Sequence, residues 1–361
     1  MQVDSKAGER MRKDVTIHDV ADAAGVSTGT VHRALYGKPG VSATVRQEIL
    51  RLADEMNYQP GPTPSMRSRR TQRIVLALPG RTRENHFFFS RMWEGCRQQL
   101  EDLSAYHLDV IEAPFDDTPE NGFAANMARV FRQYRGEIDG VLAGGRIFED
   151  SLDALSRVLS SKIPTVLVNE TFQGLEPLCT VRTDFFTEGR LAAELLSPSL
   201  GPADKVLLCA GDSRLSSNRD TVAGFESFLR TKRPEIPIIR VHGYSGVDGT
   251  FETIVRTLEA DEHIRGVFSV NLRCSLLLAE AIRQLHLQGR IFAVGSDLCD
   301  ESAQALRQGE LSCIISKNPF GQGRAAVKCL TRYLLHGKHP ELSTQLLRSE
   351  LIFQSNLEQF L

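Results

Sequence analysis

From residue 73 onwards, the chain alternates between short apolar runs and longer amphipathic stretches. The apolar runs are rich in β-branched residues and predict strands at 74–78, 108–111, 138–143, 165–168, 205–210, 266–270 and 291–294. Apolar residues at helical spacing predict helices between them, at 90–103, 123–134, 151–159, 221–229, 274–285 and 321–335. Strands that alternate with helices indicate parallel sheets with right-handed crossovers. Because about 290 residues exceed one economical core, we predict two doubly wound α/β lobes.

The first sixty residues follow a different pattern, that of short helices. Thr16 and Asp19 have the spacing of a capping box, Gly25 permits the positive φ that ends a helix, and Ser27 can cap the next helix. The inward positions of the two helices are small or aliphatic: Val20, Ala21, Ala24, Val31 and Leu35. The outer face of the second helix carries Thr28, Gly29, His32 and Arg33. Such a face suits a recognition helix in the DNA major groove, although a three-helix bundle without a nucleic-acid partner has the same periodicity.

The composition is that of a globular protein with more than one domain. The chain has 361 residues, of which 41% are hydrophobic and 24% charged. Its longest apolar runs are shorter than the roughly 18 residues of a membrane helix, and its polar N-terminus does not resemble a signal peptide. Seven cysteines without a C-x-x-C pair indicate buried thiols rather than disulfides or metal ligands. We therefore expect a cytoplasmic protein without metal or cofactor.

The net charge is unevenly distributed. Residues 1–73 hold 12 Lys and Arg against 8 Asp and Glu, and the excess comes from four arginines between 67 and 73. A basic cluster beside a helical head fits contacts with DNA phosphates, and a solvated basic linker has the same composition.

An enzyme is the rival class of function. Gly211-Asp212-Ser213 and Gly243-Tyr244-Ser245-Gly246 lack the context of an esterase motif or a nucleophile elbow. The glycines at 144 and 145 start no phosphate-binding loop. We therefore expect no catalytic activity.

The head resembles the DNA-binding headpiece of the lac repressor family of bacterial transcription regulators, whose pattern is roughly T-I-x-D-V-A-x-x-A-G-V-S-x-x-T-V-S-R-V-L-N. The chain matches it at Thr16, Ile17, Asp19, Val20, Ala21, Ala24, Gly25, Val26, Ser27, Thr30, Val31, Arg33 and Leu35. Further matches follow at Val41, Ser42, Thr44, Arg46 and Tyr58-Gln59-Pro60, whereas His32 and Tyr36 replace the usual serine and asparagine. The resemblance implies a helix-turn-helix domain at 15–60. The polar residues 1–14 before it are expected to form a disordered tail.

The resemblance also implies how the head contacts double-stranded DNA. Arg33 is the candidate for base readout, bidentate to a guanine, and Thr28 for contact with a base edge. Gly29 has no side chain to fill its reading position. Thr16, Ser27 and Thr30 are expected to contact phosphates, and His32 either contacts DNA or packs within the head. A homodimer would place two such helices on an approximately palindromic operator.

Residues 61–72 would form the hinge, and here the chain departs from the family. Family members fold a helix, roughly N-x-x-A-R-x-L, whose leucine wedges into the minor groove. The leucine position falls on Arg67, and Pro64 disfavours a helix that begins before it. Met66 as an alternative wedge and Arg67 in a narrow minor groove are both open.

Residues 73–361 resemble the sugar-binding proteins of the ribose-binding type, a periplasmic-binding-protein-like fold. The markers are Asn85-His86-Phe87-Phe88, Ala223-Gly224-Phe225, Asn271 and Val294-Gly295-Ser296-Asp297. The resemblance implies two lobes with crossings near 170, 297 and 320. Lobe one would comprise about 73–170 and 298–319, and lobe two about 171–297 and 320–361.

Ligands of α/β sheets bind beyond the carboxyl ends of strands, and the candidate effector residues follow predicted strands. Phe87 and Phe88 offer aromatic faces to a sugar ring, and Asn169, Asn271 and Asp297 can hold ring hydroxyls. By the resemblance, Lys317 and Asn318 belong to the last binding loop, and Arg219 lies near a ligand-binding arginine. The family arginine itself is replaced by Thr221, which favours neutral sugars or polyols over anions.

These observations predict a DNA-binding transcription regulator, and specifically a repressor controlled by a sugar or polyol bound between two sensor lobes. The alternative is a non-enzymatic binding protein whose DNA binding is weakened or ligand-dependent.

Overall fold

The computed structural model describes residues 15–56, 58, 71–80, 86–116, 118, 120–148, 150–243 and 249–361. The candidates Met66 and Arg67, most of the linker and the tail at 1–14 lie outside these residues. The chain divides into two units, Met1–Arg69 and Arg70–Leu361, here called the head and the sensor.

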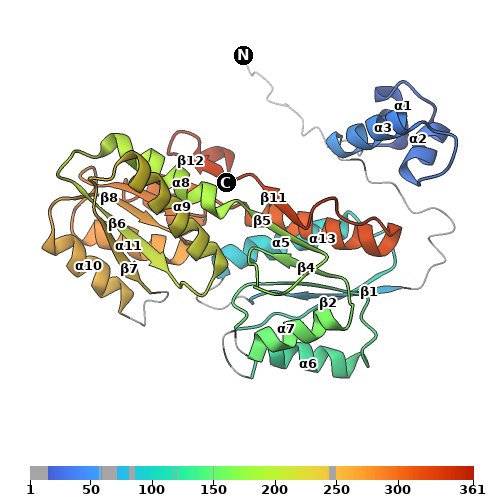
Figure 1. The fold of residues 1–361 in the computed structure, drawn as a ribbon, viewed down its shortest axis with the longest axis horizontal. Helices are drawn as coiled ribbons and strands as arrows, with labels where there is room; N and C mark the ends of the chain where they lie inside the picture. Colours follow the sequence, from blue (N-terminus) through green and yellow to red (C-terminus); the bar gives the residue numbers. More distant parts are fainter. Residues whose placement is uncertain are drawn as a thin grey trace, which may run out of the picture. The chain divides into compact units, whose positions relative to one another are not determined.

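The head is built from three helices, α1 (Ile17–Ala23), α2 (Thr28–Leu35) and α3 (Ala43–Glu55) (Figure 1). The capping box is confirmed, since the Thr16 hydroxyl accepts from the Asp19 amide and the Asp19 carboxylate accepts from the Thr16 amide at 2.7 Å. Gly25 has a φ of 63°, as predicted. The buried core joins all three helices through Val20, Ala21, Val31, Ala34, Leu35, Ile49 and Ala53.

The first sheet of the sensor has six parallel strands in the order β11-β5-β4-β3-β1-β2. They are β1 (Gln72–Ala77), β2 (Leu108–Glu112), β3 (Gly140–Gly144), β4 (Thr165–Val168), β5 (Cys179–Thr183) and β11 (Thr344–Leu347). Alternate residues of each strand point to opposite faces, and both faces are buried. Ile74 and Leu76 pack against α5 (His86–Glu101) and α13 (Pro319–His336). Val75 and Ala77 pack against α6 (Phe123–Gln133) and α7 (Asp150–Ser160).

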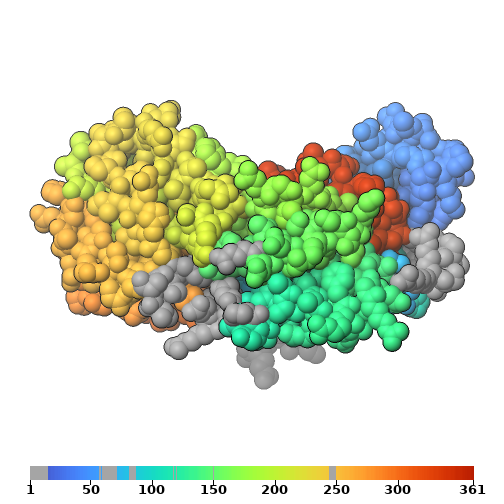
Figure 2. Space-filling model, turned by 60° about the horizontal axis from the view of Figure 1, so that its bottom comes forward, coloured from blue at the N-terminus to red at the C-terminus, as the bar shows by residue number. Residues whose placement is uncertain are grey.

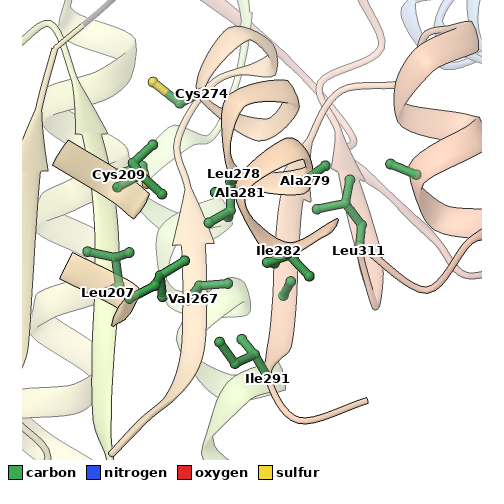
Figure 3. Packing of buried hydrophobic residues seen from close by; sticks show 14 of the residues in the cluster. Leu207, Cys209, Val267, Cys274, Leu278, Ala279, Ala281, Ile282, Ile291 and Leu311 are labelled. Carbon is green, nitrogen blue, oxygen red and sulfur yellow. The ribbon is translucent and has the colours of Figure 1, made fainter. Parts of the chain in front are cut away.

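The second sheet has the order β12-β10-β9-β8-β6-β7, and its edge strand β12 is the antiparallel one. Its strands are β6 (Lys205–Gly211), β7 (Ile238–His242), β8 (Ile264–Ser269), β9 (Phe292–Ser296), β10 (Cys313–Ser316) and β12 (Glu350–Ile352). The helices α8 (Phe185–Leu196) and α9 (Ser216–Lys232) cover one face. The other face packs on α10 (Thr250–Ala260), α11 (Leu272–Gln284) and α12 (Asp300–Arg307), and Leu278 and Ile282 of α11 share a buried cluster with Leu207 and Val267 (Figure 3).

The two sheets define two lobes, and the chain crosses between them after β5, after β10 and between β11 and β12. Most of lobe one is cyan to green in Figure 2, and most of lobe two is yellow to orange. These crossings correct the sequence-based boundaries. β5 pairs with β4, which places 171–183 in lobe one, and β10 pairs with β9, which places 298–316 in lobe two. The helix α13 returns to lobe one, where it packs on β3, β4 and β5.

Glycines allow one close helix pair in each lobe. A Cβ on Gly224 of α9 would overlap the backbone carbonyl of Phe186 in α8, and one on Gly189 would overlap the carbonyl of Thr221. The same arrangement joins α5 and α13 at Gly95 and Gly323. The glycine of the Ala223-Gly224-Phe225 marker therefore sets the distance between two helices. Among the described residues, no helix is long and apolar enough to span a membrane.

Candidate effector cavity and DNA-binding head

A cavity of about 270 Å³ lies between the two lobes of the sensor. Lobe one lines it with the first turn of α5 and the loops after β3 and β4. Lobe two lines it with the start of α9, with α11 and with residues after β8, β9 and β10. The lining residues are Phe87, Phe88, Phe89, Gly145, Arg146, Asn169, Glu170, Leu215, Ser217, Asn218, Val270, Asn271, Leu272, Arg273, Leu276, Leu277, Asp297 and Lys317.

Six of the eight effector candidates line this cavity: Phe87, Phe88, Asn169, Asn271, Asp297 and Lys317. Arg219 and Asn318 do not. Arg219 is exposed on α9, where it donates a long hydrogen bond to the carbonyl of Ser213. Asn318 caps α13: its side-chain oxygen accepts a hydrogen bond from the Gly321 backbone amide at 2.8 Å.

Asp297 and Lys317 form a buried ion pair, with side chains only 3% and 6% exposed. The Lys317 ammonium donates to the Asp297 carboxylate at 3.0 Å, the Val270 carbonyl at 3.1 Å and the Ser296 hydroxyl at 3.1 Å. The other carboxylate oxygen of Asp297 accepts from the Lys317 amide at 2.8 Å. Both charged groups thus have partners within lobe two. The pair forms part of the cavity wall, and its charges are already compensated by each other.

Two amide side chains in the cavity wall retain hydrogen-bonding capacity. Within the described residues, neither the side-chain oxygen of Asn169 nor the side-chain nitrogen of Asn271 has a partner. Buried polar atoms without partners are costly, and such atoms in a cavity wall are suited to a ligand that supplies the missing bonds.

Arg146 of lobe one reaches Asp212 of lobe two, with 3.1 Å between the guanidinium and the carboxylate. Arg214 bonds the same carboxylate at 2.8 Å, and both guanidiniums lie over the ring of Phe148. Burial opposes the charged form of Asp212, but the bonds from Arg214 and the nearby charge of Arg146 outweigh it, and the pKa of Asp212 is lowered. This ion pair links the two lobes at the cavity rim.

A buried carboxyl group lies where the crossings meet. Glu188, at the start of α8 and 2% exposed, accepts from the Ser349 hydroxyl of the third crossing at 2.7 Å. Desolvation by burial raises the pKa of Glu188, and the nearby charge of Lys317 opposes this only in part.

Sequence reasoning missed several cavity residues, among them Arg146, Glu170, Ser217, Asn218 and Arg273. Arg146 and Glu170 are the second residues after strands β3 and β4, so the strand-end rule could have found both. Ser217 and Asn218 belong to the first turn of α9, whose start the periodicity placed at residue 221.

In the head, the candidate DNA-binding face of α2 is open. Arg33 and Gly29 are exposed, Thr28 and Thr30 are half-buried, and Ser27 caps the helix by accepting from the Thr30 amide. A Cβ on Gly29 would meet only the Ser27 hydroxyl, at 3.7 Å. The space at this reading position is therefore empty.

The two departures from the family pattern contact each other. The rings of His32 and Tyr36 pack at a centroid distance of 4.5 Å, and burial raises the pKa of Tyr36. Of the two expectations for His32, packing within the head has direct support.

Two family models match the chain. Residues 76–339, more than half of the chain, match the periplasmic binding protein domain, and residues 16–61 match the bacterial regulatory proteins of the lacI family. The chain belongs to the lacI family of bacterial regulatory proteins, with a periplasmic-binding-protein-like sensor. It is a DNA-binding transcription regulator.

Individual relatives agree with this assignment. The transcriptional regulator DegA of Bacillus subtilis is 24% identical over 289 residues, which cover 78% of this chain and 81% of DegA. The sucrose operon repressor of Klebsiella pneumoniae is 31% identical over 234 residues, which cover 62% of this chain and 64% of the repressor.

Solved structures show the same fold. A LacI-type regulator from Bacteroides fragilis superimposes with a TM-score of 0.72 at 15% identity, over 80% of this chain and 99% of that one. A solute-binding protein from Actinobacillus succinogenes, solved with D-allose, has a TM-score of 0.67 at 16% identity and covers 80% of this chain and 99% of its own.

Proposed function

We propose that this chain is a homodimeric, cytoplasmic repressor whose operator affinity is controlled by a sugar or polyol bound between the sensor lobes. The observation that carries the proposal is the cavity, because it gathers six candidate residues from the first turn of α5 and from the segments after β4, β8, β9 and β10. The names of the relatives support the effector class, since one represses a sucrose operon and another a ribose operon.

DNA readout is assigned to α2. Arg33 is exposed on this helix and its guanidinium is 3.5 Å from the Thr30 hydroxyl, a long contact that a guanine can replace. Thr28 lies on the same helix at its first position. Thr16, Ser27 and Thr30 are assigned to phosphates, and two copies of the head would read two half-sites of an approximate palindrome.

Effector binding would act through the three crossings. A ligand between the lobes favours the lobe arrangement in which it makes most contacts, and it shifts the population toward that arrangement. The crossings after β5 and β10 lead into α8 and α13. A change in the angle between the lobes occurs at these crossings and moves lobe one relative to lobe two. We propose that the ligand-bound arrangement has the lower operator affinity, so that the ligand relieves repression.

The DNA-binding part is tested by selecting sites from a random duplex pool with the purified full-length protein at fixed salt. The proposal expects an enriched palindrome. Arg33→Ala should weaken binding by about 1–3 kcal/mol and relax the preference at one base pair per half-site. Arg51→Ala is the matched control, because Arg51 is an exposed arginine of the head already paired with Glu48 and Glu55.

An Arg33→Ala variant that enriches the same sequence with the same affinity removes Arg33 from the readout. A folded dimer that enriches no sequence favours the alternative function, a small-molecule binding protein with weakened or ligand-dependent DNA binding. The relatives are transcription regulators, and we propose no catalytic activity for this chain.

A further inference from the structure

Glu170 follows β4 in lobe one, yet its carboxylate is bound by lobe two. The residue is 2% exposed and belongs to the cavity wall. One oxygen accepts from the Ser216 hydroxyl at 2.7 Å and from the Ser217 amide at 3.0 Å. The other accepts from the Ser217 hydroxyl and from the side-chain amide of Asn169 at 2.9 Å. Three of the four donors thus come from the first turn of α9, in the other lobe.

The first turn of α9 lacks a cap of its own. Its N-cap residue is Leu215, whose apolar side chain accepts no hydrogen bond from the amides of the first turn. The amides at a helix N-terminus have no partners inside the helix, and the helix dipole makes this end attractive to anions. α9 is 17 residues long, and the Glu170 carboxylate occupies this anion position.

A second hydrogen bond joins the two lobes next to Glu170. The backbone amide of Thr171 donates to the Ser216 hydroxyl at 2.9 Å, and the same hydroxyl donates to Glu170. The Ser216 hydroxyl therefore accepts from the backbone of lobe one and donates to the Glu170 carboxylate. Two consecutive residues of lobe one, Glu170 and Thr171, thus hold the start of α9.

We infer that Glu170 is a tethered anion that caps α9 across the lobes, holds them together and keeps anionic effectors from the start of this helix. This inference rests on the proposed function, because it assigns specificity and regulation to the same cavity. An effector with a carboxylate or phosphate would compete with a carboxylate already attached to the protein. An effector without such a group leaves the cap in place and binds beside it, against Asn169 and Asn271.

The inference predicts chemical rescue. In Glu170→Ala, the start of α9 loses its cap, and a carboxylate-sized space opens at a helix N-terminus. Free acetate can fill that space and restore the bonds to Ser216 and Ser217. Glu170→Gln keeps an acceptor oxygen and fills the space, so acetate has no room to act. Glu176→Ala, an exposed glutamate of the same loop, is the matched control.

The measurement is hydrogen exchange of the full-length protein, read in the peptides that contain Thr171 and Ser217. In Glu170→Ala, both amides should exchange roughly tenfold faster or more: the Ser217 amide loses a bond to a charged group, and the Ser216 hydroxyl that accepts from the Thr171 amide loses the carboxylate that holds it. Acetate should reverse the change in a saturable manner in this variant and have no effect on the wild type, on Glu170→Gln or on Glu176→Ala.

Unchanged exchange at both amides in a folded Glu170→Ala, or acetate that acts equally on the wild type, overturns the inference. If Glu170→Ala does not fold, Glu170→Gln decides. It should exchange faster than the wild type at Ser217, and equal exchange overturns the inference. No DNA is present in these measurements, so their failure is distinct from a failure to select an operator.

Discussion

The Asp297–Lys317 ion pair allows a quantitative test of this part of the cavity wall. Asp297→Asn removes the carboxylate charge. It keeps a side-chain oxygen that can accept the hydrogen bond that the Lys317 amide donates to Asp297 at 2.8 Å. Asn is chosen because Asp297 has a φ of 61°, a region in which asparagine is tolerated better than alanine. Lys317→Met removes the ammonium and keeps most of the side-chain volume.

Each single substitution leaves one buried charge without its counterpart, a change that typically costs 3–5 kcal/mol. We expect about 3 kcal/mol for Asp297→Asn, at the lower end, because the ammonium keeps the Val270 carbonyl and the Ser296 hydroxyl. The double variant removes both charges, so its cost should fall below the sum of the single costs by about 0.5–3 kcal/mol.

Urea denaturation followed by the fluorescence of Trp93 measures these costs, because Trp93 is the chain's single tryptophan and is buried in the sensor. Asp102→Asn is the control, since Asp102 pairs with Arg324 at 2.8 Å while the side chains are 42% and 31% exposed. Exposed pairs contribute about 1 kcal/mol or less. Strictly additive costs at Asp297 and Lys317, or single costs as small as the control, would refute a buried, mutually dependent pair.

Three further predictions concern other parts of the chain. Gly224→Ala should destabilise the sensor by about 1–3 kcal/mol in urea denaturation, because the added methyl overlaps α8, whereas Gly201→Ala has space and should change little. Thermal denaturation between pH 4 and 8 tests Glu188. Its pKa is raised above the ordinary 4.5, so the unfolded chain ionises first, and stability falls as pH rises from 4.5 through the raised pKa. Glu188→Gln should lose this fall, and a variant that keeps the wild-type pH profile would remove Glu188 as its cause. Gly29→Asn should add a base preference worth about 1–3 kcal/mol at one position per half-site, seen as a changed enriched sequence, and an unchanged sequence would place position 29 away from the bases.

Local patterns were sufficient to predict the head and most of the sensor. Capping at Thr16 and Ser27 and the inward positions of α1 and α2 depend on residues three or four apart, which the sequence displays directly. The same holds for the long apolar strands and for the cavity residues Asn169, Asn271 and Asp297, which follow the ends of strands. These features need only the rule that parallel strands end at one edge of their sheet.

The lobe boundaries depend on pairing between distant segments, and the sequence does not display this. β5 has the sequence CTVRT, without a long apolar run, and it is a strand because β4 and β11 lie on either side of it. β12 has only three residues and pairs with β10, more than thirty residues earlier. Without these strands, the sequence pattern indicates a first crossing near 170, whereas the chain crosses after Thr183.

The chemistry of the cavity shows the same division. Asp297 and Lys317 were predicted as ligand-binding groups, but their mutual ion pair becomes evident only when β9 and β10 lie side by side. Glu170 lies near the end of β4, where the strand-end rule applies, but its bonds to Ser216 and Ser217 of the other lobe are not visible in the sequence.

Effector control of DNA binding through the cavity is the central claim, and one titration tests it most directly. The affinity of the purified protein for its selected operator is measured by fluorescence anisotropy, with and without each member of a panel of neutral sugars and polyols, for the wild type and for Asn271→Ala. The account predicts that at least one compound lowers the operator affinity of the wild type and that Asn271→Ala weakens this response while binding operator normally without the compound. Operator binding that no compound changes, or a response that Asn271→Ala leaves intact, would contradict it.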